Sequence, residues 1–302
     1  MSKLYTIAGN TFCIDIDDQL EAWQRLQPRF RPFEAEEEGS EAPSLEIDVT
    51  TGIIPVYTDE KIYEPKHNEI GLVEGTAGRL PDGCLVMDFR HIKDSRVRLR
   101  LTMPSTLDRA HVILNPKDED DPYFLSHAIM VAYVMATAVN GTLMIHASTV
   151  TYRGRAFLFQ GKSGTGKSTH ARMWTENVLG AQLLNDDNPL IRVSEDGVAM
   201  VYGSPWSGKT DCYRNESAPI GGFLRIRRAD YNELRPIENP LKAYASLTAS
   251  MFYLPVFNDR QREMRHLAIE RLVKTVSCYD MYCRPDSDAA HCALKGAMRS
   301  NK

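Results

Sequence analysis

Residues 161–168, GKSGTGKS, form a glycine-rich segment that follows the pattern GxxxxGK[ST]. The segment comes directly after an apolar run, Ala156–Phe159, and precedes a helix-forming run that begins at Lys167. Glycine lets successive backbone N–H groups turn toward one centre without a clash from a Cβ atom, and the start of a helix adds partial positive charge there. This order of strand, loop and helix is typical of phosphate-binding loops, so the sequence predicts an α/β domain around residues 156–177.

Two side chains of this segment have predicted roles in holding a nucleotide. Lys167 can reach the β- and γ-phosphates, and the hydroxyl of Ser168 can bind Mg²⁺. The rest of the loop would surround the phosphates with backbone N–H groups. The predicted cofactor-binding residues are Gly161, Lys162, Ser163, Gly164, Thr165, Gly166, Lys167, Ser168 and Thr169.

Two adjacent acids, Asp186 and Asp187, end a short apolar run that begins at Leu183. One acid can hold Mg²⁺ while the other accepts the proton of an attacking hydroxyl. The run Asn-Asp-Asp-Asn-Pro is also typical of a turn at the end of a strand. Because a phosphate-binding loop precedes the pair in the chain, we favour the catalytic interpretation.

A second segment, Gly203–Thr210, also fits GxxxxGK[ST]. Pro205 stiffens it and the residues after it begin a helix poorly, so we do not expect a second nucleotide site there. A loop that follows the predicted strand Val198–Tyr202 could instead cover the nucleotide and place Lys209 on the transferring phosphoryl group. A surface loop held by the packing of Trp206 explains the same residues, and both interpretations stay open.

Three features together resemble the catalytic domain of HPr kinase/phosphorylase: the GKSGTGKS loop, the acid pair after a short helix and strand, and an upstream strand that carries Ile145-His-Ala147. The loop also resembles that of phosphoenolpyruvate carboxykinase, which shares this nucleotide-binding fold. The resemblance covers residues 140–300. It implies a mixed-sheet α/β P-loop domain rather than a doubly wound parallel sheet, and the family's kinases are often hexameric, which would make this chain a homo-oligomer.

The resemblance also implies ATP and Mg²⁺ as cofactors and transfer of the γ-phosphate to a hydroxyl of a protein, a peptide or a small molecule. On this basis Lys167 would bind phosphates and Ser168 would ligate Mg²⁺. Asp187 would accept the proton, and Asp186 would assist it or bind the metal. His146 matches a histidine near the family's active site, although a histidine in an apolar strand is often a core residue.

The sequence departs from the family at three places. Thr169 stands where the family usually has an acid, and no segment matches the family's metal-ligating glutamate and arginine-rich loop. The first 110 residues do not match the family's N-terminal domain. These departures bear on the HPr substrate and on phosphorylase activity more than on kinase chemistry. They keep open a nucleotide-binding regulatory or assembly protein with little turnover, and a small-molecule kinase.

Composition excludes several other classes. The 36 Lys and Arg against 40 Asp and Glu give a net charge of −4, so no global positive field points to nucleic acid. Six cysteines without a CxxC pair favour reduced thiols over a disulfide scaffold. The N-terminus does not read as a signal peptide, and the apolar run Ile129–Val139 is too short to cross a bilayer. We therefore expect a cytoplasmic protein without a membrane segment.

Residues 1–115 are predicted to form a β-rich α+β domain of unknown role, and residues 116–302 a P-loop kinase-like domain. Helical spacing over Asp18–Leu26 should end before Pro28. The strictly alternating run Arg96–Leu101 predicts a strand with three arginines on one face. A solvated face explains them, and contact with an acidic partner is the alternative. A second basic alternation, Leu224–Arg228, suggests a solvated strand edge or a basic rim for a phosphate or an acidic peptide.

Overall fold

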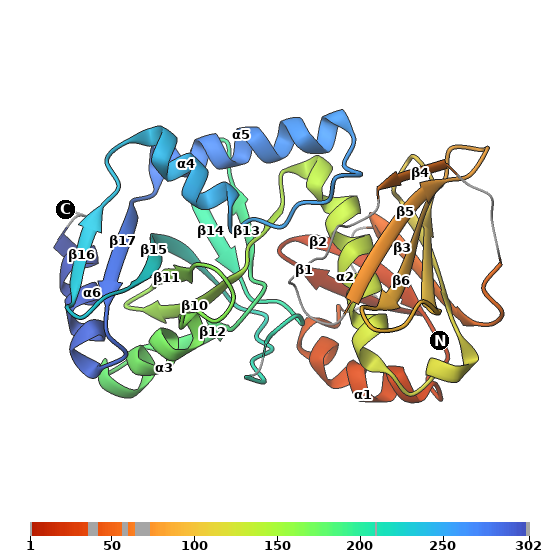
Figure 1. The fold of residues 1–302 in the computed structure, drawn as a ribbon, viewed down its shortest axis with the longest axis horizontal. Coiled ribbons are helices and arrows are strands. Elements are labelled where there is room, and N and C mark those ends of the chain that lie inside the picture. Colours follow the sequence, from red (N-terminus) through yellow and green to blue (C-terminus); the bar gives the residue numbers. More distant parts are fainter. Residues whose placement is uncertain (1, 36–41, 56–59, 64–72, 209, 300–302) are drawn as a thin grey trace. The chain divides into compact units, whose positions relative to one another are not determined.

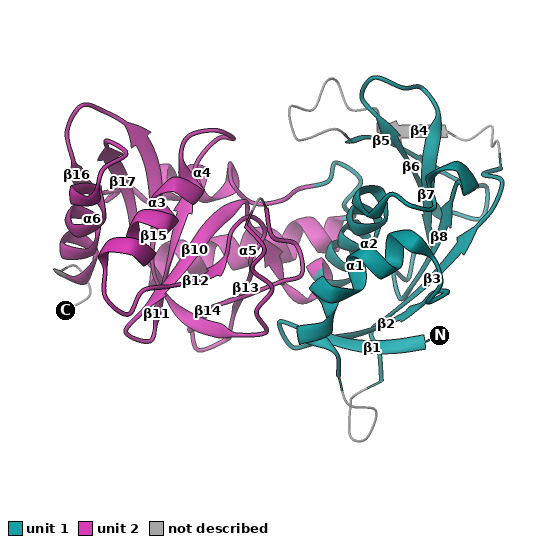
Figure 2. Ribbon diagram, turned by 90° about the horizontal axis from the view of Figure 1, so that it is seen from below, with its two compact units in different colours: residues 1–137, 254–258 teal, residues 138–253, 259–302 magenta. Residues whose placement is uncertain are grey.

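The computed structural model describes residues 2–35, 42–55, 60–63, 73–208 and 210–299, whose fold is drawn in Figure 1. The chain divides into two compact units, coloured separately in Figure 2. Unit 1 comprises Met1–Thr137 and Leu254–Asn258, and unit 2 comprises Ala138–Tyr253 and Asp259–Lys302. Each unit contains α-helices and a sheet with both parallel and antiparallel pairs, which confirms the predicted mixed α/β architecture.

The division between the units lies later in the chain than the boundary predicted at 115/116. Helix α2 (Pro122–Thr137) belongs to unit 1, where it packs against β3 (Leu45–Thr51), β7 (Val97–Met103) and β8 (Arg109–Leu114). A buried helix belongs with the sheet whose apolar face it covers, and composition does not reveal which sheet that is. The predicted boundary therefore separates α2 from its own unit.

The segment Pro122–Asn140, which joins α2 to the short 3₁₀ turn η3 (Ala138–Asn140), is long and apolar enough to cross a membrane, with a mean hydropathy of 1.4. This segment is longer than the run Ile129–Val139, on which the prediction of no membrane segment was based. Within the structure 78% of its most apolar 18-residue window is buried, as in the core helix of a globular unit. A helix that is apolar on all sides is typical of both settings, so this one is weak evidence for a membrane span.

The sheet of unit 1 has eight strands in the order β1-β2-β3-β8-β7-β6-β5-β4, and the pairs β2–β3 and β3–β8 are parallel. Buried residues alternate along β3 and β8, as expected for strands with one face against a core. The remaining elements are β1 (Ser2–Ile7), β2 (Asn10–Asp15), β4 (Glu60–Tyr63), β5 (Val73–Arg79), β6 (Leu85–His91), the 3₁₀ turns η1 (Arg31–Phe33) and η2 (Pro116–Asp118), and α1 (Glu21–Phe30).

Helix α1 runs past the proline that was predicted to end it. Pro28 lies inside the helix, which continues to Phe30. Phe30 is fully buried, with its ring 5.6 Å from that of Tyr5 and 5.7 Å from that of Trp23. Burial of an aromatic ring stabilises by about 2–3 kcal/mol, which offsets the cost of a proline near a helix end.

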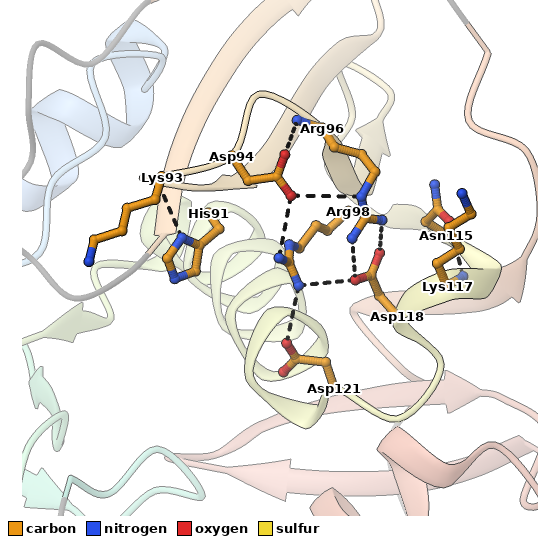
Figure 3. Close-up of polar contacts among 9 residues, drawn as sticks. All are labelled: His91, Lys93, Asp94, Arg96, Arg98, Asn115, Lys117, Asp118 and Asp121. Atoms are coloured by element: carbon orange, nitrogen blue, oxygen red, sulfur yellow. Dashed lines mark hydrogen bonds and ion pairs between the residues drawn. The ribbon is translucent and has the colours of Figure 1, made fainter.

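The three arginines of the predicted strand Arg96–Leu101 do not form a solvated basic face: β7 begins at Val97, so Arg96 precedes it and Arg98 and Arg100 lie within it. Figure 3 shows Arg96 and Arg98 converging on Asp118, which is 2% exposed. The Arg98 Nη1 atom lies 3.1 Å from this carboxylate, and Arg96 donates to it through both terminal nitrogens. Arg100 pairs with Asp88 on β6 at 2.6 Å. The carboxylates come from separate segments, so each of these arginines has an acidic partner within unit 1 rather than a solvated position.

Unit 2 is built on a nine-stranded sheet, in which β12-β10-β11-β15-β14-β13-β9 form a path and β17 joins both β15 and β16. The pairs β11–β15 and β15–β17 are parallel. The strands are β9 (Leu143–Met144), β10 (Ala147–Tyr152), β11 (Arg155–Gln160), β12 (Gln182–Asn185), β13 (Leu190–Val193), β14 (Ala199–Tyr202), β15 (Ser217–Arg228), β16 (Glu233–Pro236) and β17 (Cys278–Cys283).

Helices cover both faces of this sheet (Figure 1). On one face, α3 (Lys167–Asn177) and α6 (Ser287–Arg299) bury Phe157 and Phe159 of β11. On the other face, α4 (Pro240–Thr248) and α5 (Asp259–Thr275) bury Leu158. Side chains of a strand point alternately to its two faces, so β11 anchors both cores and is held on both sides. The loop that leaves the end of β11 therefore starts from a rigid base.

The sequence predicts one strand over Thr142–Tyr152, and the structure breaks it in two. β9 pairs with β13, whereas β10 pairs with β11 and β12. The chain changes partners at Ile145 and His146, so these residues leave the regular ladder. His146 then lies at the start of β10, beside the end of β12, where the predicted acid pair follows.

Candidate active site

The glycine-rich loop connects the end of β11 to the start of α3, as the motif predicts. Gly161, Gly164 and Gly166 have φ angles of 150°, 75° and 110°, a region that side chains with a Cβ atom rarely occupy. A Cβ atom on Gly161 would also lie 2.8 Å from the hydroxyl of Thr165, which donates to the carbonyl of Lys162 at 2.8 Å. The tight curve of the loop therefore depends on glycine at its first position.

Lys167 folds back into the loop that precedes it. Its Nζ atom donates to the carbonyl oxygens of Gly161 at 3.0 Å and of Lys162 at 3.3 Å, and the residue is only 8% exposed. Burial lowers the pKa of this amine, and the charges of Asp187 and Asp186 act against that shift. The ammonium group thus sits inside the loop and in the electrostatic field of both acids.

A turn after β12 sets the direction of the two acids. The side-chain oxygen of Asn185 accepts from the backbone N–H groups of Asp187 and Asn188, both at 2.9 Å. The N–H of Ala147 donates to the Asp187 carbonyl at 2.9 Å, and Ala147 pairs with Gln160 across β10 and β11. Gln160 and Asp187 therefore flank Ala147, about 10 Å apart at normal strand spacing. The strand-end turn that the sequence offered as an alternative to a catalytic acid pair is therefore present. It holds Asp186 and Asp187 near the glycine-rich loop.

Asp186 is a buried carboxylate with one free oxygen. The residue is 4% exposed, and its Oδ1 atom accepts a 2.6 Å hydrogen bond from the hydroxyl of Ser148. Its Oδ2 atom is buried and has no hydrogen-bond partner among the described residues. Buried polar atoms are nearly always satisfied, so this oxygen is a candidate ligand for a cation. The described residues contain no group of three or more His, Cys, Asp or Glu that could hold a metal by itself.

Asp187 is more accessible and is oriented by two side chains. Its Oδ1 atom lies 2.8 Å from His146 Nδ1, and its Oδ2 atom accepts from the side-chain amide of Asn188 at 2.9 Å. The side chains of His146 and Asp187 are 43% and 32% exposed. The His146 backbone N–H is fixed to the carbonyl of Ser250 at 2.8 Å. His146 is therefore a partly exposed partner of an acid rather than a core residue.

The loop after β14 packs directly against the acid pair. A Cβ atom on Gly208 would lie 3.2 Å from both the Asp186 carbonyl and the Asp187 Cβ, which leaves room only for glycine or a small shift. Trp206 is 4% exposed, and its carbonyl accepts from the Asn188 N–H at 3.2 Å. The packed tryptophan of the second interpretation is thus present, and the loop also approaches the acids. The role of the loop as a cover of the nucleotide stays a prediction. Lys209, the predicted cation of the loop, lies outside the described residues.

Ser168 and Thr169 are the second and third residues of α3, and Ser168 is exposed at the helix start next to the loop. Exposed Lys162, Ser163 and Gly164 form the outer part of the loop. The structure thus brings Lys167 into the field of Asp186 and Asp187, and places His146 on Asp187. The functional roles of all these residues remain predictions.

Ser148 was not singled out by sequence reasoning, whereas Arg228 belongs to the run Leu224–Arg228, for which a basic rim that receives a phosphate was one of the interpretations. Ser148 lies in β10 and His146 directly precedes this strand, and both side chains contact the acids. Arg228, at the end of β15, donates to the carbonyl of Gly164 in the loop. The parallel pairing of β15 with β11 brings it there, and this pairing has no local sequence signal. The other arginines of β15 differ: Arg225 and Arg227 pair with Asp280 at 2.6 and 3.1 Å.

Replacing Ser148 with alanine is expected to destabilise the protein when no cation is bound, and a bound cation should recover part of the loss. The substitution leaves the buried Asp186 carboxylate without its described hydrogen-bond donor, at a cost of about 1–3 kcal/mol in the free energy of unfolding. Urea unfolding with and without Mg²⁺ and nucleotide measures the change. We expect Mg²⁺ with nucleotide to restore more stability in the variant than in the wild type. Ser148→Thr, which keeps the hydroxyl, is the control, and equal losses in both variants would contradict the role of this bond.

His170, in the first turns of α3, makes stability sensitive to acid. It is 4% exposed and its Nε2 atom lies 3.0 Å from the Cys283 sulfur. Burial lowers its pKa to about 4, whereas burial raises the pKa of the Cys283 thiol to about 11. The unfolded chain therefore binds a proton to His170 at a higher pH than the folded chain does. This contribution to stability is full above pH 6.5 and is lost as the pH falls toward 4.

We expect this residue to account for about 3 kcal/mol of acid destabilisation between pH 6.5 and 4. His170→Gln should therefore lose less stability over this range than the wild type. Urea unfolding at a series of pH values provides the comparison. His291→Gln, at an exposed histidine on α6, should keep the wild-type slope. An unchanged slope in His170→Gln would show that the pKa of His170 does not differ between the folded and the unfolded chain.

In comparisons with known proteins, no protein-family model and no curated protein matches the chain. Among solved structures, the chain is similar to the Hpr(Ser) kinase/phosphatase from Coxiella burnetii, with a TM-score of 0.32 and 9% sequence identity. The match covers 53% of this chain and 99% of that one. A TM-score this low carries no weight for the fold or the function of this chain, so the functional proposal rests on the site itself.

Proposed function

We propose that this chain is an ATP- and Mg²⁺-dependent phosphotransferase that moves the γ-phosphate to a hydroxyl, with a serine of a protein or peptide as the first acceptor to test and a small-molecule alcohol as the second. One observation carries the proposal. The ammonium group of Lys167 lies inside a glycine-rich loop and in the field of two acids, one of which is paired with a histidine.

The loop and Lys167 would hold the phosphates. Carbonyl oxygens are neutral partners for the buried Lys167 ammonium, and phosphate oxygens carry negative charge. A phosphate oxygen adds the attraction of opposite charges to the hydrogen bond from the ammonium group, so Lys167 can exchange its carbonyl partners for phosphate oxygens. The start of α3 adds the partial positive charge of its free N–H groups.

Asp186 and Ser168 fit a Mg²⁺ ion that is bound together with nucleotide. Mg²⁺ at nucleotide sites usually takes one or two carboxylates along with phosphate oxygens and water, rather than an all-protein cage. Asp186 offers one buried oxygen without a partner, and Ser168 offers a hydroxyl beside the loop. When bound, the ion would neutralise charge on the phosphates.

Asp187 would accept the proton of the attacking hydroxyl. It is partly exposed, so an acceptor can reach it, and Asn188 holds one of its oxygens while His146 contacts the other. His146 can orient Asp187 and receive or share the proton across their 2.8 Å contact. Asp187 is thus a catalytic residue in this proposal, and His146 and Asn188 position it.

Calorimetric titration of the full chain with ATP, with and without Mg²⁺, tests the binding part of the proposal. Transfer of label from γ-labelled ATP to serine-containing peptides and to small alcohols, with ADP release, tests the reaction. We expect binding and Mg²⁺-dependent ADP formation. Absence of ATP binding contradicts the proposal. Tight Mg-ATP binding with no ADP formation and no transfer supports a nucleotide-binding regulator instead.

A further inference from the structure

Unit 1 contains a cavity of about 620 Å³ that the proposed phosphotransfer does not use. It is lined by residues of β5, β6 and β7 and by two further segments, 53–55 and 115–117. Its volume is within the range of pockets that hold small organic molecules, about 300–1,000 Å³. All its lining residues belong to unit 1.

The wall of the cavity is mostly apolar. Seven of its lining residues are aliphatic or proline and come from five separate segments: Ile53, Ile54, Pro55, Ala77, Val86, Val97 and Pro116. Ile53 is 92% exposed, so its apolar side chain contacts solvent. A ligand in the cavity would cover this side chain. Val86 is 3% exposed and forms part of the packed wall. Such a wall favours a ligand with an apolar body.

The polar groups of the cavity carry an excess of positive charge. Arg100 is 6% exposed and is fixed by Asp88 at 2.6 and 2.9 Å and by the Pro55 carbonyl at 2.6 Å. Arg90 shares the same carboxylate at 3.4 Å and donates to Thr76 at 2.6 Å. Asp88 therefore serves two arginines.

Lys117 adds a third cation to the lining. It is exposed, and among the described residues no carboxylate lies within ion-pair distance of its amine. Among the described residues that line this cavity, three cations thus accompany one carboxylate between apolar walls. We propose that this cavity binds a small organic anion with an apolar body, its anionic group facing Arg90 and Lys117 and its body against Ile53, Ile54 and Val86.

The proposal stands apart from the phosphotransfer reaction, so its test needs no substrate of that reaction. The probe is 8-anilinonaphthalene-1-sulfonate, an organic anion with an apolar body whose fluorescence rises in apolar sites. The matched neutral probe is N-phenyl-1-naphthylamine, which has the same rings without the sulfonate. Both are titrated into the folded full chain. We expect one saturable site that prefers the sulfonate over the neutral probe.

Lys117→Gln and Arg90→Gln should each reduce the affinity for the sulfonate about tenfold, and leave the affinity for the neutral probe within about twofold. Lys93→Gln, at an exposed lysine of unit 1 outside the cavity lining, should change neither. Circular dichroism and thermal unfolding check the fold, and Lys117→Gln alone suffices if Arg90→Gln unfolds. No saturable binding, equal affinity for the two probes, or sulfonate affinity unchanged by Lys117→Gln would overturn the proposal.

Discussion

Lys167→Met is expected to reduce the rate of phosphoryl transfer by about 10²–10³-fold. The substitution removes a fixed positive charge that would stabilise the negative charge developing on the transferring phosphoryl group. Methionine has a side chain of similar length, and its apolar character suits a position where the side chain is only 8% exposed. The fold should therefore persist. Initial rates of ADP formation and of label transfer at saturating Mg²⁺, with circular dichroism to check the fold, measure the effect.

Lys162→Met is the matched control for this experiment. Lys162 lies in the same loop and its side chain is exposed, whereas only its backbone carbonyl contacts Lys167. Lys162 would contribute to nucleotide binding through its backbone N–H group, which the substitution keeps, so the same change of side chain should alter the rate less than about threefold. A Lys167→Met protein that transfers phosphate at the wild-type rate would falsify the assignment of the loop.

The local parts of the site were predictable from the sequence. The loop, its flanking strand and the helix at Lys167 follow from glycine positions and apolar runs within about 20 residues, and the structure places them at those residues. The turn at Asp186 and Asp187 was also predictable, because asparagine beside aspartate is typical of a strand end. In each case the determining residues are neighbours in the chain.

The parts that depend on distant partners were not predictable. The break at Ile145–His146 arises because β9 and β10 pair with different strands. Arg228 reaches the loop through the parallel pairing of β15 with β11, and no residue near it in the chain indicates this. The arginines of β7 are neutralised by acids that lie about 10 or more residues away in the chain, such as Asp88 and Asp118. Periodicity shows that such side chains share a face, and only the fold shows what meets them.

Asp187→Asn should lower kcat by about 10²–10⁴-fold while leaving the affinity for Mg-ATP within about twofold. The amide keeps the shape of the side chain but accepts a proton poorly, so the loss should fall on the chemical step. Asp186→Asn should behave differently, because a neutral ligand in a buried position raises the Mg²⁺ concentration needed for half-maximal activity. Rates measured over a series of Mg²⁺ concentrations separate the two acids. Asp196→Asn, at an exposed turn acid, is the control and should match the wild type.

His146→Gln combined with Asp187→Asn then tests whether the two residues act as one unit. Their 2.8 Å contact predicts that the double variant is about as slow as Asp187→Asn alone, since His146 acts through Asp187. If the effects instead multiply, His146 has a separate role, and the proton acceptor must be reassigned. If Asp186→Asn and Asp187→Asn instead change the Mg²⁺ concentration for half-maximal activity equally, the proposed roles are wrong. Asp186 would then not be the metal ligand with Asp187 as the proton acceptor.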